Sequence, residues 1–195
     1  MQKTKVITGI DTRLSYFHGW EPTSVNGGPA RYSTAILIPK SDTQTVQAII
    51  GAINAALEQG IAKFGGKMPN RATLKLPLRD GDVESEDEAY KGHYFLNAHS
   101  KSAPQIVDQN IKKITDRSEV YSGCYARVSL NFFAYNVDGN RGVAVGLGNI
   151  QKIRDGESFE KRSSAEEDFG TKEETSSFDD FGTNVEYEEA TDFLD

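Results

Sequence analysis

Apolar and polar positions alternate along the first forty residues. In 3–16, a segment rich in β-branched residues, every second position is apolar or threonine, and 31–39 repeats the alternation. A period of two is typical of strands with one buried face. We therefore expect strands over 3–16 and 31–39, joined by a loop over 21–29, where glycine and proline supply turn residues. The alternating residues of the first strand are Val6, Thr8, Ile10, Thr12 and Leu14.

One amphipathic helix is predicted after the second strand. Ser41 and Gln44 have the spacing of a capping box, in which their side chains satisfy free backbone N–H groups at the start of a helix. Gly65 and Gly66 are typical of a helix end. The apolar residues at helical spacing are Val46, Ile49, Ile50, Ile53, Leu57 and Ile61.

The second half of the chain predicts further strands and no second long helix. Segment 70–88 is charged and irregular, and strands are expected over 92–100, 105–107, 121–135 and 141–153. Asp138-Gly139 has the chemistry of a tight hairpin turn between the last two strands. Strands around one helix, without a repeated βαβ rhythm, predict a mainly β fold, either a small antiparallel barrel or a sandwich.

The strand over 121–135 has two chemically different faces. Its core face carries Ala126, Val128, Leu130, Phe132 and Ala134, and its other face carries Tyr125, Arg127, Ser129, Asn131, Phe133 and Tyr135. Aromatic faces stack nucleobases and arginine contacts phosphates, so the second face is suited to single-stranded nucleic acid. Segment 92–101 repeats this composition with His93, Phe95, Asn97, His99 and Lys101. The alternative is that each aromatic side chain simply covers core.

The C-terminal residues form an acidic tail with a phenylalanine repeat. Residues 165–195 contain 12 acidic residues and one lysine, whereas residues 1–164 contain 21 basic and 17 acidic residues. Asp-Phe recurs every 12 residues, with phenylalanines at Phe169, Phe181 and Phe193. A segment so charged and poor in aliphatic residues is expected to be disordered. We therefore predict a binding domain over 1–156 and a disordered acidic tail over 157–195.

Other chemistry is weakly indicated. The three histidines lack zinc-ligand spacing, and the single Cys124 is expected to be buried and inert. The acidic run from Asp80 to Glu88 leaves open a metal-dependent nuclease as an alternative. No nucleophile–base arrangement and no apolar stretch long enough to cross a bilayer is present. We expect a cytoplasmic protein that is not an enzyme and has no cofactor.

An ordered set of motifs resembles a family of tailed-phage single-stranded-DNA-binding proteins with an oligonucleotide/oligosaccharide-binding (OB) fold. The resemblance implies sequence-tolerant binding of single-stranded DNA during phage replication and recombination, in the cytoplasm of a bacterial host. The predicted helix departs from a standard five-stranded OB barrel, because it follows the second strand rather than the third. The matching stretches are KVITG (5–9), YSTAILIPKSDT (32–43), LPLRDGD (76–82), GHYFLNA (92–98), SEVYSGCY (118–125) and GNIQK (148–152).

These observations predict two sets of functional residues. The tail is expected to compete with DNA for the groove in which the single strand would bind. It is also expected to recruit replication or recombination proteins through Phe169, Phe181, Asp192 and Phe193. A protein-interaction adaptor is a further alternative, and pairing of edge strands makes an oligomer possible. The candidate DNA-binding residues are Tyr125, Arg127, Asn131, Phe133, Tyr135, Phe95, His93, Lys101, Trp20, Arg31, Arg79 and Lys152.

Overall fold

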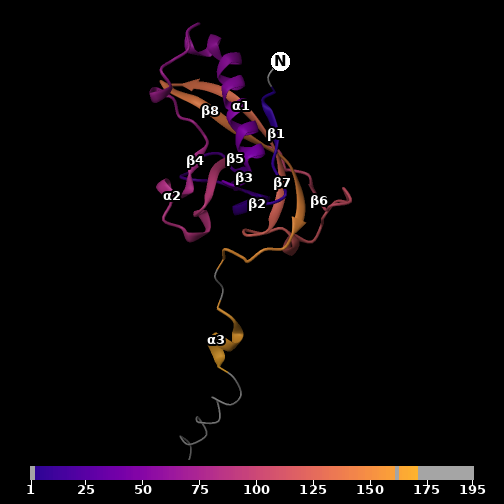
Figure 1. Ribbon diagram of the computed structural model, residues 1–195. Coiled ribbons are helices and arrows are strands. Elements are labelled where there is room, and N and C mark those ends of the chain that lie inside the picture. The colour runs from indigo at the N-terminus through magenta and orange to yellow at the C-terminus, as the bar shows by residue number, and fades with distance from the viewer. Residues whose placement is uncertain (1–2, 161–162, 171–195) are drawn as a thin grey trace, which may run out of the picture. The chain divides into compact units, whose positions relative to one another are not determined.

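A ring of five strands forms the body of the protein. The computed structural model describes residues 3–160 and 163–170, and the chain divides into two units, 1–160 and 161–195 (Figure 1). In the first unit the ring runs in the order β7, β2, β3, β5, β8 and returns to β7. The predicted mainly β barrel is therefore confirmed. Its strands are β2 (Arg13–Thr23), β3 (Arg31–Pro39), β5 (His93–Ser100), β7 (Tyr125–Val137) and β8 (Asn140–Arg154).

The ring closes at two narrow seams. Strand β2 meets β7 at one register pair, Arg13 with Tyr125, and β5 meets β8 in parallel at another, His99 with Gly146. The other three contacts of the ring are antiparallel ladders. Three short strands flank the ring: β1 (Lys5–Ile7) on β7, β4 (Arg79–Asp80) on β5 and β6 (Ile106–Val107) on β8.

The predicted first strand is divided into β1 and β2. Thr12 donates its N–H to the carbonyl of Gly9, which turns the chain between the two strands, and both strands pair with β7. Gly9 lies against the start of the helix, since a Cβ at this position would be 2.3 Å from Oδ2 of Asp42. Strand β2 continues beyond the predicted end at residue 16 to Thr23, and its register against β3 shifts between Ser15 and His18, where Tyr16 has a φ of 46°.

Helix α1 (Thr43–Gln59) follows β3, as predicted, and packs across β1, β7 and β8. Its cap is Asp42, which accepts a hydrogen bond from the N–H of Thr45 at 3.1 Å, so the predicted Ser41 capping box is wrong by one residue. The helix ends at Gly60, and a 3₁₀ turn over Ile61–Phe64 leads to Gly65 at φ 81°. The predicted apolar stripe is buried at Ile49, Ile53 and Leu57.

Segment 70–88 is more regular than its charged composition predicts. It contains 3₁₀ helix Arg71–Thr73, strand β4 and the short helix α2 (Gly81–Glu84), and 3₁₀ helix Glu88–Tyr90 follows. Gly81 permits this compact path, because a Cβ there would lie 2.1 Å from the carbonyl oxygen of Tyr90. The segment covers one end of the outer face of β3 and β5, where Tyr90 packs with Leu37 and Phe95.

The hairpin of β7 and β8 confirms the two-faced strand. Asp138 (φ 50°) and Gly139 (φ 81°) have the positive φ angles of a tight hairpin turn. The five predicted core residues of β7 are all buried, and they pack in one core with residues such as Leu14, Ile36 and Leu96. Among the described residues, no helix combines the length and the apolar character needed to cross a lipid bilayer.

The second unit contributes one described element, the short helix α3 (Ala165–Phe169). Ser164 caps it, and Ser164 and Glu167 form a reciprocal capping box. Phe169 is exposed. The predicted tail contacts at Phe181, Asp192 and Phe193 lie outside the described residues. The sequence predicts disorder from residue 157 onward, whereas residues 157–160 belong to the first unit and 165–169 form α3.

Two adjacent phenylalanines on β7 test this architecture. Phe132 is 1% exposed and Phe133 is 41% exposed. Phe132→Ala is expected to lower the free energy of unfolding by about 3–5 kcal/mol, because it leaves a cavity in the core. Phe133→Ala should cost less than about 1 kcal/mol, as is usual for a surface site. Urea denaturation followed by circular dichroism measures both, and equal losses would contradict the assigned faces.

Candidate nucleic-acid interface

A continuous row of outward-facing residues runs around the barrel. Neighbours of the row along the strands, such as Thr34, Ala98 and Leu130, are buried, so alternation places the row on the outer surface. Each member lies in register with the next across six strands. The row consists of His18 (β2), Ser33 (β3), His99 (β5), Gly146 (β8), Asn131 (β7) and Lys5 (β1).

The row contains polar and basic side chains and no carboxylate. Lys5 and Asn131 are exposed, and Lys101 is exposed directly after β5. His99 is partly buried, and this burial, with a smaller effect from the positive charge of Arg31, lowers its pKa. Arg31 is therefore close enough to His99 to add positive charge to this part of the row.

An exposed aromatic ring lies beside the row. A Cβ on Gly146 would be 3.8 Å from Cε1 of Phe133, so the Phe133 ring borders a surface that has no side chain. Phe133 is exposed, and Tyr135, two residues further along the same face, is half-buried. A ring next to bare backbone leaves space in which a planar group can stack.

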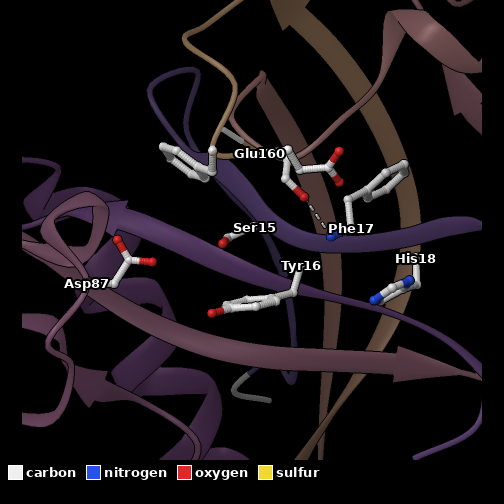
Figure 2. Close-up of a pocket in the computed structure, with 8 residues that line it drawn as sticks. Ser15, Tyr16, Phe17, His18, Asp87 and Glu160 are labelled. Atoms are coloured by element: carbon white, nitrogen blue, oxygen red, sulfur yellow. Dashed lines mark hydrogen bonds between the residues drawn. The ribbon is translucent and has the colours of Figure 1, made fainter. Parts of the chain in front are cut away.

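A small pocket adjoins the His18 end of the row. Figure 2 shows Tyr16 and Phe17 projecting from opposite sides of β2. The N–H of Phe17 donates to Oγ of Ser122 at 3.0 Å, while Tyr16 is exposed. The pocket has a volume of about 200 Å³ and is lined by Ser15, Tyr16, Phe17, His18, Asp87, Ser122, Phe159 and Glu160.

The C-terminal end of the barrel unit is fastened beside this pocket. Nη2 of Arg13 donates to the carbonyl of Glu157 at 2.8 Å, and its guanidinium lies 4.3 Å from the centre of the Phe159 ring. The N–H of Phe159 donates to the carbonyl of Ser122 at 3.0 Å. We refer to residues 157–159 as the tail anchor.

Phe95 belongs to the interior. It is 5% exposed, forms an edge-to-face contact with Tyr90 at 4.9 Å, and lies under the guanidinium of Arg79 at 4.7 Å. The prediction that Phe95 stacks a base conflicts with this burial. The alternating pattern of 92–101 could not predict this burial, because the residues that cover Phe95 come from another segment of the chain, 79–90.

Several other candidates make contacts within the protein. Nε1 of Trp20 donates to the carbonyl of Val120 at 3.0 Å, and Arg79 pairs with Glu84 at 2.8 Å. Lys152 is largely buried and pairs with Asp155 at 2.7 Å. Three further candidates also contact the protein: Tyr125 lies against the guanidiniums of Arg13 and Arg154, His93 Nδ1 against the carbonyl of Lys91, and Arg127 Nε donates to the carbonyl of Thr8.

The acidic run is engaged in ion pairs and helix caps. Lys40 lies 2.7 Å from Asp80 and 2.6 Å from Asp82, and the hydrogen bond from Lys40 lowers the pKa of Asp82. Glu84 and Glu88 pair with Arg79 and Lys91. Within residues 3–160 and 163–170, no group of three or more metal-ligating side chains is arranged to hold a metal ion.

Cys124 is buried, as expected, and burial raises the pKa of its thiol. A thiol held in its protonated form is a poor nucleophile. This cysteine therefore contributes to packing.

The row brings together residues that sequence reasoning did not select. His18, Ser33, Gly146 and Lys5 became neighbours of His99 only through the register of six strands. The alternation of segment 92–101 already placed His99 and Asn97 on the outer face. The sequence around the other members of the row did not indicate binding, and a glycine has no side chain that could suggest a contact.

A protein-family model and one relative match most of this chain. The model of the family described as Enterobacter phage Enc34, ssDNA-binding protein, matches residues 4–181. Protein p50 of Acyrthosiphon pisum secondary endosymbiont phage 1 is 34% identical over 162 residues, which cover 76% of this chain and 83% of that protein.

Two solved structures share the fold. The single-stranded DNA-binding protein from bacteriophage Enc34 in complex with ssDNA has a TM-score of 0.68 and 22% identity, covering 80% of this chain and 88% of that chain. The single-stranded DNA-binding protein gp2.5 encoded by bacteriophage T7 has a TM-score of 0.57 and 14% identity, covering 86% and 95%. The barrel is accordingly OB-like.

The burial of His99 predicts a pH dependence of stability. Because its pKa is lowered in the folded state, the unfolded chain binds this proton more readily, so this contribution destabilises the fold as pH falls through the ordinary value of 6.5. His99→Asn cannot titrate. Urea denaturation between about pH 8 and about pH 5 should show wild type losing stability relative to the variant. A difference that stays constant with pH would contradict the assignment.

Proposed function

Because the chain belongs to the family of the Enterobacter phage Enc34 ssDNA-binding protein, we propose that it binds single-stranded DNA along the outward row of its barrel. The observation that carries the proposal is the row itself, which is free of carboxylates and crosses six strands from His18 to Lys5. The fold shared with a relative whose structure contains ssDNA supports it. In OB folds generally, the face of the second and third strands binds oligonucleotides, and here those barrel strands are β3 and β5.

Two kinds of contact would hold the strand. Arg31 and Lys101 neutralise phosphates, while a base stacks on Phe133 over the bare surface of Gly146. Tyr16, close to His18 in β2, and Tyr135, two residues from Phe133 on the same face of β7, offer further rings. Stacking and phosphate neutralisation do not depend on base identity, so binding is sequence-tolerant. Of the other candidate residues, we assign Asn131 to this path and treat Phe95, Trp20, Arg79, Lys152 and Tyr125 as structural.

The biological setting follows from the same chemistry. A sequence-tolerant binder of single strands protects and organises exposed DNA wherever duplexes are opened. We assign the protein to phage DNA replication and recombination in the cytoplasm of the bacterial host. Its family is one of DNA-binding proteins rather than enzymes.

Titration of an oligo-dT strand tests the proposal. Phe133→Ala should weaken binding by about 1–3 kcal/mol, or roughly 5- to 150-fold, because one stacking contact is lost. Phe133→Tyr retains a ring and should stay close to wild type. Fluorescence anisotropy with a labelled oligonucleotide provides the measurement.

Two controls accompany this titration. Binding should weaken steeply between about 50 and about 200 mM NaCl, because basic side chains release condensed counterions. A duplex of the same length should bind more weakly than the single strand. Equal affinity for duplex and single strand, or no dependence on salt, would refute the proposal.

We further infer that the acidic tail competes with DNA. We divide the chain into a binding domain over 1–156 and a tail over 157–195, in which the tail anchor fixes the first residues beside the pocket that contains His18. The acidic residues that follow are thus attached next to one end of the row. Attachment gives them a high effective concentration at that surface. DNA that displaces the tail also frees its Asp-Phe motifs for replication or recombination proteins.

Removal of residues 165–195 tests this competition. The deletion should tighten binding of oligo-dT several-fold at low salt and less at high salt, because 12 acidic residues are removed against one lysine. Thermal unfolding serves as the control for an intact barrel. Unchanged or weaker affinity in a folded deletion variant would argue against competition.

A further inference from the structure

A second groove begins at the Lys5 end of the row. Strands β1, β7, β8 and β6 are consecutive neighbours in the sheet (Figure 1). Residues of all four strands line the groove. Lys5 and Ile7 of β1 form one rim, and Val107 and Ile111 at β6 form the other, with Arg127, Ser129 and Gln151 between them. Its volume is about 260 Å³. We name it the β1–β6 trough.

The rims of the trough expose isoleucine side chains. Ile7 is 54% exposed and Ile111 is 70% exposed. Ile111 also has a φ of 63°, a left-handed conformation that is strained for a β-branched residue. Strain of this kind is retained mainly where function needs the side chain in that place.

A hydrogen-bonded turn over residues 108–112 holds Ile111 at the surface. The carboxylate of Asp108 accepts hydrogen bonds from the N–H groups of Asn110 at 2.7 Å and Lys112 at 3.0 Å. The N–H of Asp108 donates to the carbonyl of Lys112 at 2.8 Å, and that of Ile111 donates to the carbonyl of Asp108. The exposure of Ile111 is thus fixed by the surrounding hydrogen bonds.

The trough is positively charged as well as apolar. Lys5 and Arg127 lie in it, and Lys112 and Lys113 follow Ile111 on the same loop. None of the ion pairs formed in residues 3–160 and 163–170 involves these four side chains. Their charges are therefore available to an acidic ligand.

The complementary ligand is a peptide that places an aromatic ring next to carboxylates. This chain contains such a segment three times, as Asp168-Phe169, Asp180-Phe181 and Asp192-Phe193. From Glu160 to Phe193 the chain can extend to roughly 100 Å, which exceeds the width of a domain of this size. A tail released by DNA can therefore reach the next molecule on the same strand.

We propose that the β1–β6 trough binds an Asp-Phe segment from the tail of a neighbouring copy bound to the same DNA strand. The phenylalanine ring packs between Ile7 and Ile111, and the carboxylates pair with Lys5 and Arg127. Each tail displaced by DNA then links its own barrel to the next one. This inference rests on the proposed function, since DNA both frees the tail and aligns the copies.

Methyl NMR of the full chain tests the contact. One sample carries labelled isoleucine methyl groups and the substitutions Phe169→Ala, Phe181→Ala and Phe193→Ala. It is mixed with unlabelled chain that has an intact tail and the substitutions Ile7→Ser and Ile111→Asn. On an oligo-dT long enough for several copies, the labelled Ile7 and Ile111 methyl signals should show ring-current shifts, because only the other chain supplies phenylalanine motifs.

Two comparisons make the result decisive. The methyl of Ile50, an isoleucine of α1 that is 37% exposed, should not move. On an oligonucleotide that holds one copy, the Ile7 and Ile111 signals should also stay in place. Absence of shifts on the long strand, or equal shifts on the short strand, would overturn the proposal, the latter because DNA itself would then occupy the trough.

Affinities for a short and a long oligo-dT distinguish this inference from the proposed function, because only the long strand holds several copies. Ile111→Asn relieves the strained φ, because asparagine tolerates this conformation, so the variant should be at least as stable as wild type. It should bind a short oligo-dT normally and lose about tenfold or more in affinity for a long one. Ile10→Ser, at a site that is 55% exposed, is the matched control and should bind both normally. Failure to bind the short strand would refute the proposed function, whereas unchanged long-strand affinity in Ile111→Asn would refute this inference alone.

Discussion

Closure of the strand ring is the constraint on which the rest of the structure depends. The hairpin of β7 and β8 supplies one strand to each seam, at Arg13 with Tyr125 and at His99 with Gly146. Once the ring is closed, every second residue of a barrel strand faces the core and its neighbours face outward. The outward row is a product of this geometry, because the register that closes the second seam also places His99 beside Gly146 and Asn131.

Patterns in the sequence predicted the helices and strands themselves better than the points at which they end or divide. The alternation in β7, the turn at Asp138-Gly139 and most of the apolar stripe of α1 depend on residues close in the chain, and these are confirmed. Of the predicted stripe, Ile50 is exposed and Ile61 lies beyond the end of the helix. The division of the first strand at Gly9 and the continuation of β2 past Tyr16 depend on contacts with α1 and β3. Such tertiary contacts leave little trace in a one-dimensional pattern.

The site was harder to predict because the exposure of a side chain depends on residues from other parts of the sequence that pack over it. Phe95 and Phe133 have the same residue type and the same place in an alternating strand, yet only Phe133 is open to solvent. The difference arises from Arg79, which belongs to the charged segment expected to be irregular, and from Tyr90, which follows that segment. Lys152 and Arg79 differ from this case, because their partners Asp155 and Glu84 are only three and five residues away in the sequence.

The tail anchor separates a fixed part of the chain from a part whose length is adjustable. Arg13, Ser122 and Phe159 set the origin of the tail on the barrel, so residues added beyond it do not disturb the core. Each 12-residue repeat adds about 40 Å of maximum extension and one more Asp-Phe motif. Repeat number is therefore a simple evolutionary variable, through which related phages can change the reach and valency of the tail while the barrel stays the same.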